Sequence, residues 1–382
     1  MVAEYFLWFL TVTGLIYAAL ILVYTYGWFS LKTHKTQKVE ADTPKASIII
    51  PARNESENIL NLLRDLIRLN TDKKLYEVIV VDDHSEDNTP ELVDTFIADN
   101  RLSNMRLIRV SGNLSTGMYK KGAISLGLKE ADGELIITTD ADCRVGPEWL
   151  NALLGFHQEE KPKMIVGPVM YEDIPSPFTR MQGLEFLSLI AITGGAIKIG
   201  RPVMCNGANL MYEKSAFDAV GGFSKDGFAS GDDVFLLLRF YKAFGPESVR
   251  FLKNTDAVVK TKPVETIGQF IQQRTRWASK NKGYDLRILF VSVTVYLLNL
   301  LIVAGLLLAA FGWLPWKTYL LALALKSLID LPILIGITSF VKQQKLLPYS
   351  LLLIPLYPLY IVITGALGIT GGFRWKGRKI NR

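Results

Sequence analysis

Residues 133–142 read GELIITTDAD, an apolar run of strand length that ends in two aspartates, Asp140 and Asp142. Two comparable runs precede it, ASIIIP at residues 46–51 and EVIVVDD at residues 77–83, and polar stretches of helical character separate the three. Strands that alternate with helices in this way are typical of a mostly parallel sheet with helices on both faces. The sequence therefore predicts an α/β domain with a mostly parallel central sheet, and we place its bounds at residues 45–265.

Asp82 and Asp83 close the strand at residues 77–83, at the sheet edge where ligands bind in open α/β sheets. Carboxylates in this position can accept hydrogen bonds from a ligand, such as the imide of uracil or a ribose hydroxyl. The alternative is an acidic cap on the following helix, for which Ser85 and Asp87 are also suited. The residues alone leave both interpretations open.

Asp140 and Asp142 are one residue apart, so their side chains point the same way at the end of a strand. Hard carboxylate oxygens in this arrangement hold Mg²⁺ or Mn²⁺, ions that keep open positions for substrate phosphates. An acidic turn without a ligand is the alternative, and the position after an apolar strand favours the metal site.

Two further motifs carry reactive side chains. The segment GFASGDDVFLLLRF, residues 227–240, places Asp232 and Asp233 at the start of a helix, where one carboxylate can take a proton from an attacking hydroxyl or merely cap the helix. The segment QQRTRWASKNK, residues 272–282, clusters basic residues around Trp277. These side chains can grip a pyrophosphate and stack on a sugar, or form a basic helix at a membrane face, and the two roles are compatible.

Three stretches contain no charged residue: residues 5–31, 288–316 and 346–373. Each is longer than the ~20 apolar residues that a helix needs to cross a bilayer, which excludes a purely soluble protein. We interpret residues 1–31 as a retained anchor, 266–287 as an interfacial amphipathic helix, 288–373 as transmembrane or re-entrant helices and 374–382 as a basic cytoplasmic tail. Lys32, Lys35 and Lys38 follow the first stretch and indicate that the catalytic domain is cytoplasmic.

The number of membrane crossings stays open. If all the later stretches crossed, the tail would lie outside, although its five basic residues and lack of acids favour the inside. Pro355 and Pro358 indicate that the last stretch is re-entrant or lies in the interface. Lys326 and Asp330 interrupt residues 318–341 four positions apart, so they either neutralise each other on a helix or take part in handling the acceptor. Residues 178–201 contain charges and a glycine pair, so we expect a helix that lies against the membrane or the core.

Composition and missing motifs exclude several classes of protein. The net charge of +7 comes from basic residues beside the apolar stretches, which is typical of membrane surfaces, and we expect no nucleic-acid partner. Two cysteines and three histidines exclude a disulfide scaffold and a His-rich metal site. The sequence contains no G-x-G-x-x-G, G-x-x-x-x-G-K-[ST] or H-E-x-x-H motif.

The four motifs, in this order and spacing, resemble the family 2 glycosyltransferases with a GT-A fold. The resemblance covers about residues 47–277, and it implies a Rossmann-like GT-A catalytic domain flanked by transmembrane helices. It implies that Asp83, with Asp82 beside it, binds the base of a nucleotide-sugar. It also implies that Asp140 and Asp142 bind Mg²⁺ or Mn²⁺ on the diphosphate.

The same resemblance assigns the catalytic base to Asp233, with Asp232 beside it where many members have Glu. The membrane-embedded branch of the family carries Q-x-x-R-W, which residues 273–277 match in full. The resemblance further implies that Asn209 contacts the acceptor and that Lys121, with Lys120 as the second choice, contacts the donor. The donor-binding residues from the Q-x-x-R-W segment would be Gln273, Arg274, Arg276 and Trp277.

The function that we expect is inverting transfer of a sugar, with UDP-sugar as the preferred donor, to a membrane lipid or lipid-linked acceptor, which forms a β-glycosidic bond. The closing WKGR is similar to the tail of lipid glucosyltransferases of the ceramide type. One alternative is a processive or short-chain polysaccharide synthase with a glycan acceptor. A second is a non-catalytic membrane protein that binds a nucleotide-sugar. We expect an integral membrane protein, with a bacterial inner membrane as its location.

Overall fold

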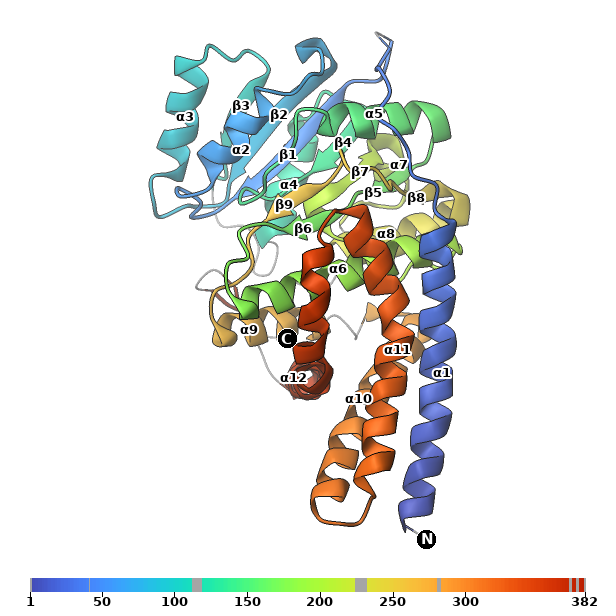
Figure 1. Cartoon of the computed structure of the whole chain (residues 1–382). Coiled ribbons are helices and arrows are strands. Elements are labelled where there is room, and N and C mark those ends of the chain that lie inside the picture. Colours follow the sequence, from blue (N-terminus) through green and yellow to red (C-terminus); the bar gives the residue numbers. More distant parts are fainter. Residues whose placement is uncertain are drawn as a thin grey trace.

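The computed structural model describes residues 2–40, 42–111, 119–223, 232–279, 283–370, 373–375 and 378–380. An α/β domain lies at one end, and long helices extend away from it on one side (Figure 1). Two further helices, α6 (Pro177–Lys198) and α9 (Ile267–Ala278), lie between these two parts.

The central sheet has seven strands, and it follows the buried apolar runs of the sequence. The first, second and fourth strands along the chain bury nearly all of their side chains, as a sheet that is covered on both faces requires, and the third, at the sheet edge, is only partly buried. The order across the sheet is β3 (Met105–Arg109), β2 (Tyr76–Asp82), β1 (Ala46–Ala52), β4 (Leu135–Thr138), β7 (Leu210–Glu213), β5 (Met164–Val166) and β8 (Val249–Phe251).

Only β7 runs against its neighbours in the described sheet, and the other adjacent strands pair in parallel. The predicted mostly parallel α/β fold is therefore confirmed. After β1 the chain builds β2 and β3 on one side and then returns to place β4 on the other. The carboxyl ends of β1 and β4 meet at this change of direction, which is where open sheets of this kind bind ligands.

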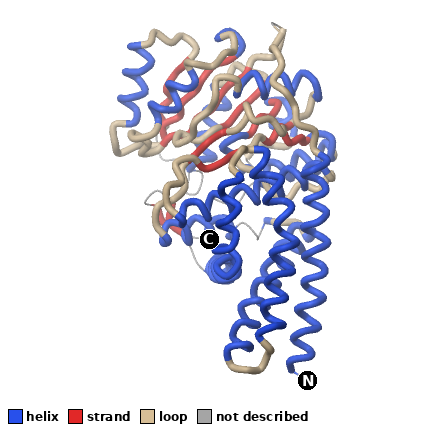
Figure 2. Tube along the Cα trace, in the orientation of Figure 1, coloured by secondary structure: helices blue, strands red, loops and turns tan. Residues whose placement is uncertain are grey.

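Helices cover both faces of the sheet, as Figure 2 shows. Pro90 lies in the first turn of α3, where its missing N–H costs no helix hydrogen bond. Asn54 has a φ of 52° in the loop after β1, and the first helix of this domain begins at Ile59. The covering helices are α2 (Ile59–Leu66), α3 (Thr89–Asp99), α4 (Tyr119–Glu130), α5 (Trp149–Glu160), α7 (Lys214–Ala219) and α8 (Asp232–Phe244).

Smaller elements complete the domain. Strands β6 (Val169–Tyr171) and β9 (Val259–Thr261) pair in parallel, and β10 (Phe373–Trp375) pairs antiparallel with β11 (Arg378–Ile380). Short 3₁₀ helices occur at Lys73–Leu75, Gly207–Asn209, Pro246–Ser248 and Gln344–Tyr349.

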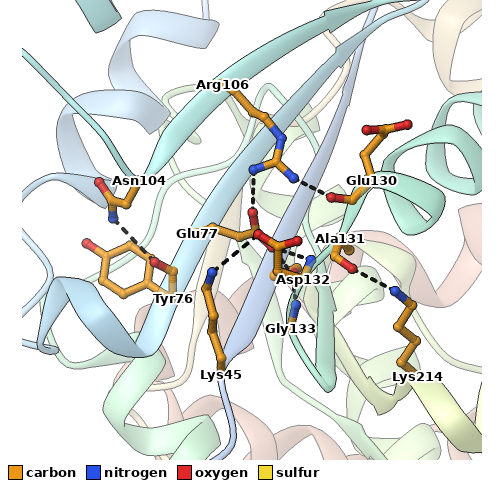
Figure 3. A network of polar contacts seen from close by, with 11 residues as sticks. Lys45, Tyr76, Glu77, Asn104, Arg106, Glu130, Ala131, Asp132, Gly133 and Lys214 are labelled. Carbon is orange, nitrogen blue, oxygen red and sulfur yellow. Dashed lines mark hydrogen bonds and ion pairs between the residues drawn. The ribbon is translucent and has the colours of Figure 1, made fainter.

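A buried carboxylate ties the amino ends of the first strands together, at the edge opposite the predicted site (Figure 3). Glu77 accepts hydrogen bonds from the Ser47 hydroxyl at 2.6 Å and from the Asp132 backbone N–H at 2.7 Å, and it forms an ion pair with Arg106. Burial alone would raise the pKa of Glu77, but these hydrogen bonds and the Arg106 charge outweigh burial and lower the pKa. The Glu77 carboxylate therefore serves to hold neighbouring strands together.

Four helices are long and apolar enough to cross a membrane among the described residues. Three of them, α1 (Val2–Ser30), α10 (Leu286–Ala310) and α11 (Trp316–Phe340), pack against one another and extend away from the sheet (Figure 1). The fourth, α12 (Ser350–Thr370), contains Pro355 and Pro358.

Helix α6 (Pro177–Lys198) packs closely against α1 through a pair of glycines. A Cβ on Gly195 would lie 2.1 Å from the carbonyl oxygen of Tyr24, and a Cβ on Gly27 would lie 2.3 Å from the carbonyl oxygen of Gly195. The two backbones can approach this closely only because neither residue has a side chain. The segment predicted to lie against the membrane or the core thus packs across the top of the long helices.

Both ends of α12 lie near helices that adjoin the α/β domain. Just before α12, the hydroxyl of Tyr349 accepts a hydrogen bond from Arg180 in α6 at 2.5 Å. Near its other end, a Cβ on Gly368 would lie 2.8 Å from Cβ of Ala278 at the end of α9 (Ile267–Ala278). Helix α12 therefore begins and ends on the same side of the helix bundle.

Candidate active site

One cavity of about 960 Å³ joins the carboxyl edge of the sheet to the long helices. It begins among the acidic residues that follow β1, β2 and β4 and continues between α1, α10, α11 and α12. The structure thus brings together residues from all four sequence motifs. Those that line the cavity are Asp83, Asp140, Asp142, Asp233, Gln273, Arg274, Arg276 and Trp277.

Asp140 and Asp142 follow β4 and both line the cavity. Asp140 forms an ion pair with Lys120, and Asp142 accepts a hydrogen bond from the Thr261 hydroxyl at 3.4 Å. Within the described part of the chain, no group of three or more His, Cys, Asp or Glu residues is arranged to hold a metal ion. Two hard carboxylates fit Mg²⁺ or Mn²⁺ when phosphate oxygens complete the coordination, which is the arrangement these ions commonly have.

The side chains of Asp82 and Asp83, at the end of β2, have different contacts. Asp83 lines the cavity and contacts Nδ1 of His84 at 3.1 Å. Asp82 is buried and accepts a hydrogen bond from the Ser85 backbone N–H at 3.3 Å, and its Oδ1 has no hydrogen-bond partner among the described residues. Both side chains are buried, but only Asp83 lines the cavity, which favours Asp83 for ligand contact.

Arg53 is a residue of this site that the sequence motifs did not identify. It follows β1, lines the cavity and donates from Nη1 to the carbonyl oxygens of Asp83 and His84, each at 2.7 Å. Its other terminal nitrogen pairs with Glu86. Arg53 therefore fixes the loop that carries Asp83, and its position directly after the first apolar strand was a usable signal.

Asp233 lies at the start of α8, and its two oxygens have different backbone partners. Oδ1 accepts from the N–H of Val234 at 2.8 Å and Oδ2 accepts from the N–H of Gly207 at 3.1 Å. These bonds hold the carboxylate in place at the cavity wall. The side chain of Asp232 lies outside the described residues.

Tyr284 also lines the cavity near Asp233, and the sequence offered no motif that would have identified it. Burial is the main reason that its pKa is raised, and the negative charge of Asp233 raises the pKa further. Tyr284 therefore stays protonated at neutral pH and presents a hydroxyl group close to the candidate base.

The structure does not support the predicted contact of Lys121 with the donor. The Lys121 side chain is 3% exposed and does not line the cavity, whereas Lys120 lines it and pairs with Asp140. Successive residues of a helix face directions about 100° apart, so only one of two neighbouring lysines on α4 can face the site. The second choice, Lys120, is the residue at the site.

The structure does not support the predicted contact of Asn209 with the acceptor either. Asn209 is 0% exposed, and its Nδ2 donates to the carbonyl oxygens of Pro168 and Ala257, each at 2.8 Å. Its Oδ1 accepts from Nε1 of Trp149 at 3.1 Å. Both donor hydrogens and the acceptor oxygen are thus used inside the domain, and Asn209 links strand ends beneath the cavity.

The Q-x-x-R-W segment lies on α9, and its two arginines have different environments. Arg276 and Trp277 are half-buried at the cavity wall. Arg274 is 4% exposed and forms an ion pair with the equally buried Glu185 of α6. Its guanidinium also lies 4.2 Å from the ring centre of Trp277. The charge of Arg274 is therefore neutralised within the protein, which differs from the donor contact that we expected.

Lys326 and Asp330 form the expected pair, with Nζ 2.7 Å from Oδ2. The hydroxyl of Tyr17 in α1 donates to the other oxygen of Asp330 at 2.7 Å. This cluster lines the far end of the cavity, between the long helices. Beyond it, buried residues of α1, α10 and α11 pack together, among them Leu298, Ile302 and Tyr319, and these three do not line the cavity.

Comparisons of the sequence with known families agree with this arrangement. The sequence model of glycosyl transferase family 2 matches residues 47–221, and that of glycosyl transferase family group 2 matches residues 135–363, which is more than half of the chain. Together the two matches cover the sheet, the acidic motifs and most of the long helices.

Two relatives illustrate the likeness. The chain is 28% identical over 269 residues to a probable glycosyltransferase, YdaM, of Bacillus subtilis, which is 69% of this chain and 61% of that protein. It is 26% identical over 251 residues to a beta-monoglucosyldiacylglycerol synthase of Trichormus variabilis, 65% of this chain and 52% of that protein. The aligned region thus spans between about half and three fifths of the lengths of these two relatives.

A solved structure shares the fold. The mannosyltransferase PcManGT from Pyrobaculum calidifontis, in complex with GDP-Man and Mn²⁺, superposes with a TM-score of 0.60 over 94% of this chain and 98% of that one, at 17% sequence identity. The likeness identifies the sheet and its covering helices as a GT-A fold. The match to the two family models shows that the chain belongs to the family 2 glycosyltransferases.

Proposed function

We propose that the protein transfers one sugar from a UDP-sugar to the hydroxyl group of a membrane lipid, with inversion, so that the product carries a β-glycosidic bond. The observation that carries this proposal is the single cavity that joins the carboxylates at the sheet edge to the apolar walls of α10, α11 and α12. A water-soluble acceptor needs no such apolar extension. A lipid acceptor needs both a polar reaction centre and an apolar route to it.

The names of the relatives support a lipid acceptor. Several are beta-monoglucosyldiacylglycerol synthases, and others are undecaprenyl-phosphate transferases. These proteins differ in acceptor, but both acceptor classes named are lipids. The four long apolar helices give this chain the means to reach such an acceptor within a bilayer.

On the donor side, Asp83 would accept a hydrogen bond from the base, and its place in the cavity lining at the carboxyl edge of the sheet supports this role. Asp140 and Asp142 would hold Mg²⁺ or Mn²⁺ together with the diphosphate, and Mn²⁺ is present in the PcManGT complex. Such an ion would neutralise charge that develops on the departing nucleoside diphosphate. Lys120 and Arg276 add fixed positive charge on the cavity wall.

On the acceptor side, Asp233 takes the proton from the attacking hydroxyl. Its hydrogen bonds to the Gly207 and Val234 N–H groups orient the carboxylate before the acceptor arrives. The hydroxyl oxygen bonds to the anomeric carbon as the bond from that carbon to the diphosphate breaks. Attack from the face opposite the leaving group inverts the anomeric centre.

The extent of the cavity favours transfer of a single sugar over extrusion of a glycan. The cavity lining extends no further than Tyr17 on α1 and Leu323 on α11 among the described residues. A processive synthase needs a path for its product through or past the protein. Analysis of the product separates these alternatives, because single transfer adds one sugar per lipid and a processive synthase produces a ladder.

The test uses membranes that contain the protein, a panel of radiolabelled nucleotide-sugars and analysis of the lipid fraction. We expect label from one UDP-sugar in a lipid with one added sugar. Replacing Asp233 by Asn should lower the rate roughly 10²–10⁴-fold, which is the usual contribution of base catalysis, with donor binding retained.

The exposed Asp218 on α7 offers a control, since Asp218→Asn makes the same chemical change away from the cavity. That variant should transfer at the wild-type rate. Turnover of Asp233→Asn at the wild-type rate would show that another group is the base. Donor binding without transfer to any lipid or glycan would leave a binding protein as the function.

A further inference from the structure

A buried carboxylate on α6 joins the helix of the Q-x-x-R-W motif to a helix of the membrane side. One oxygen of Glu185 pairs with Arg274 on α9, and the other accepts a hydrogen bond from the Tyr360 hydroxyl on α12 at 2.9 Å. The side chains of Glu185 and Arg274 are each 4% exposed. The Glu185 carboxylate therefore links α6 to α9 and α12, which are far apart in sequence.

Arg274 connects this carboxylate to the reaction centre through aromatic contacts. Its guanidinium lies 4.5 Å from the ring centre of Phe270 and 4.2 Å from that of Trp277, so the cation is held between the two rings. Trp277 itself lines the cavity. Removal of the Glu185 charge would release Arg274, and the indole of Trp277 would lose the partner that fixes its orientation.

Tyr360 connects the same carboxylate to the apolar wall of the cavity. Its ring packs edge-on against Phe270 at 5.2 Å, and Tyr360 lines the cavity together with Leu353, Ile361 and other residues of α12. A lipid chain in this part of the cavity would lie against α12. A change in the position of α12 would therefore act on Glu185 through a directional hydrogen bond.

We propose that Glu185 is a positioning residue that sets the orientation of Trp277 through Arg274, and that through Tyr360 it couples occupancy of the lipid side of the cavity to donor binding. The inference rests on the proposed lipid acceptor. Because coupling free energies are reciprocal, bound lipid should raise donor affinity and bound donor should raise lipid affinity by the same factor.

Tyr360→Phe tests the coupling with the smallest change, because it removes the hydroxyl and keeps the ring against Phe270. Donor affinity is measured by calorimetry on the full chain in nanodiscs, with and without a short-chain diacylglycerol as the probe lipid. We expect the lipid to raise donor affinity in the wild type roughly five-fold or more, and this increase to disappear in the variant. The KM for the lipid should rise by a similar factor.

Tyr349→Phe is the matched control. It also removes a tyrosine hydroxyl, one that links α6 to the segment before α12 through Arg180, and that bond does not involve α9. Its coupling factor should equal that of the wild type. A purely structural role of Tyr360 would lower thermal stability in both variants and leave both coupling factors unchanged.

Glu185→Gln tests the positioning role, although a buried Arg274 without its counter-charge can impair folding. The double variant Glu185→Gln, Arg274→Met removes both charges and should fold, yet its kcat should stay low because Trp277 has lost the cation that packs against its ring. Wild-type kcat in the double variant, or wild-type coupling in Tyr360→Phe, would overturn this inference alone. Failure of the wild type to glycosylate any lipid would instead overturn the proposed function.

Discussion

Lys120 and Lys121 are neighbours in the chain, yet the structure gives their side chains opposite environments. Lys120 faces the cavity and pairs with Asp140, and Lys121 points into the domain. The sequence alone cannot tell which of two adjacent lysines at the start of a helix faces the cavity, because this depends on how α4 is rotated against β1 and β2. The same holds for Arg274, whose partner Glu185 lies 89 residues away.

Lys120→Met should therefore weaken donor binding, and Lys121→Met should not. Loss of a charged contact to a diphosphate raises the donor KM roughly ten-fold or more, since such contacts contribute about 1.5–3 kcal/mol. Steady-state kinetics with varied donor concentration measure this difference. Loss of donor affinity in Lys121→Met, with Lys120→Met unchanged, would reverse the assignment.

Asn209→Ala should destabilise the protein without changing the chemistry. The substitution leaves the carbonyl oxygens of Pro168 and Ala257 and the indole N–H of Trp149 buried without their partner. The expected loss is about 3 kcal/mol, which lowers the thermal midpoint by roughly 6–12 °C. Thermal unfolding measures stability, and kcat/KM per folded molecule should stay near the wild-type value. A raised acceptor KM at unchanged stability would restore the acceptor role.

At the scale of elements, the apolar runs predicted the strands well and the loops poorly. The strands at residues 46–51 and 77–83 follow from continuous burial, which local sequence patterns express directly. The helix after the first strand begins only at Ile59, because Arg53 and Ser56 in the intervening loop form hydrogen bonds with the loop after β2. Such long-range contacts decide element boundaries and leave no local signal.

The contact between α1 and α6 depends on two glycines, so Gly195→Ala should disturb it. The new Cβ would lie 2.1 Å from a carbonyl oxygen of α1, and the backbones would have to separate. Forced overpacking of this kind costs about 1–3 kcal/mol. The thermal stability of the detergent-solubilised protein measures the effect. Gly14→Ala on α1 is the control, because nothing lies within 4 Å of its Cβ, and equal stability of the two variants would contradict the contact.

At the scale of the whole molecule, the distribution of basic residues and the path of α12 favour the same membrane topology. Helix α1 reaches the α/β domain from the far side of the bundle, α10 leaves the domain and α11 returns to it (Figure 1). Helix α12 then starts beside α6 and ends beside α9. If the bundle spans a bilayer, three helices cross it and the fourth is re-entrant. The basic residues that precede the domain and those of residues 374–382 then lie on one side, as the positive-inside rule requires.

We therefore expect residues 374–382 and the catalytic domain to lie on the same side of the membrane, with the start of α1 on the other. Epitope tags fused before α1 and after Arg382 make this testable in sealed inside-out vesicles. Added protease should remove the tag after Arg382 together with the catalytic domain, and the tag before α1 should resist until detergent opens the vesicles. A tag after Arg382 that survives while the catalytic domain is cleaved would mean that α12 crosses the bilayer, because the tail could then reach the lumen only by a fourth crossing.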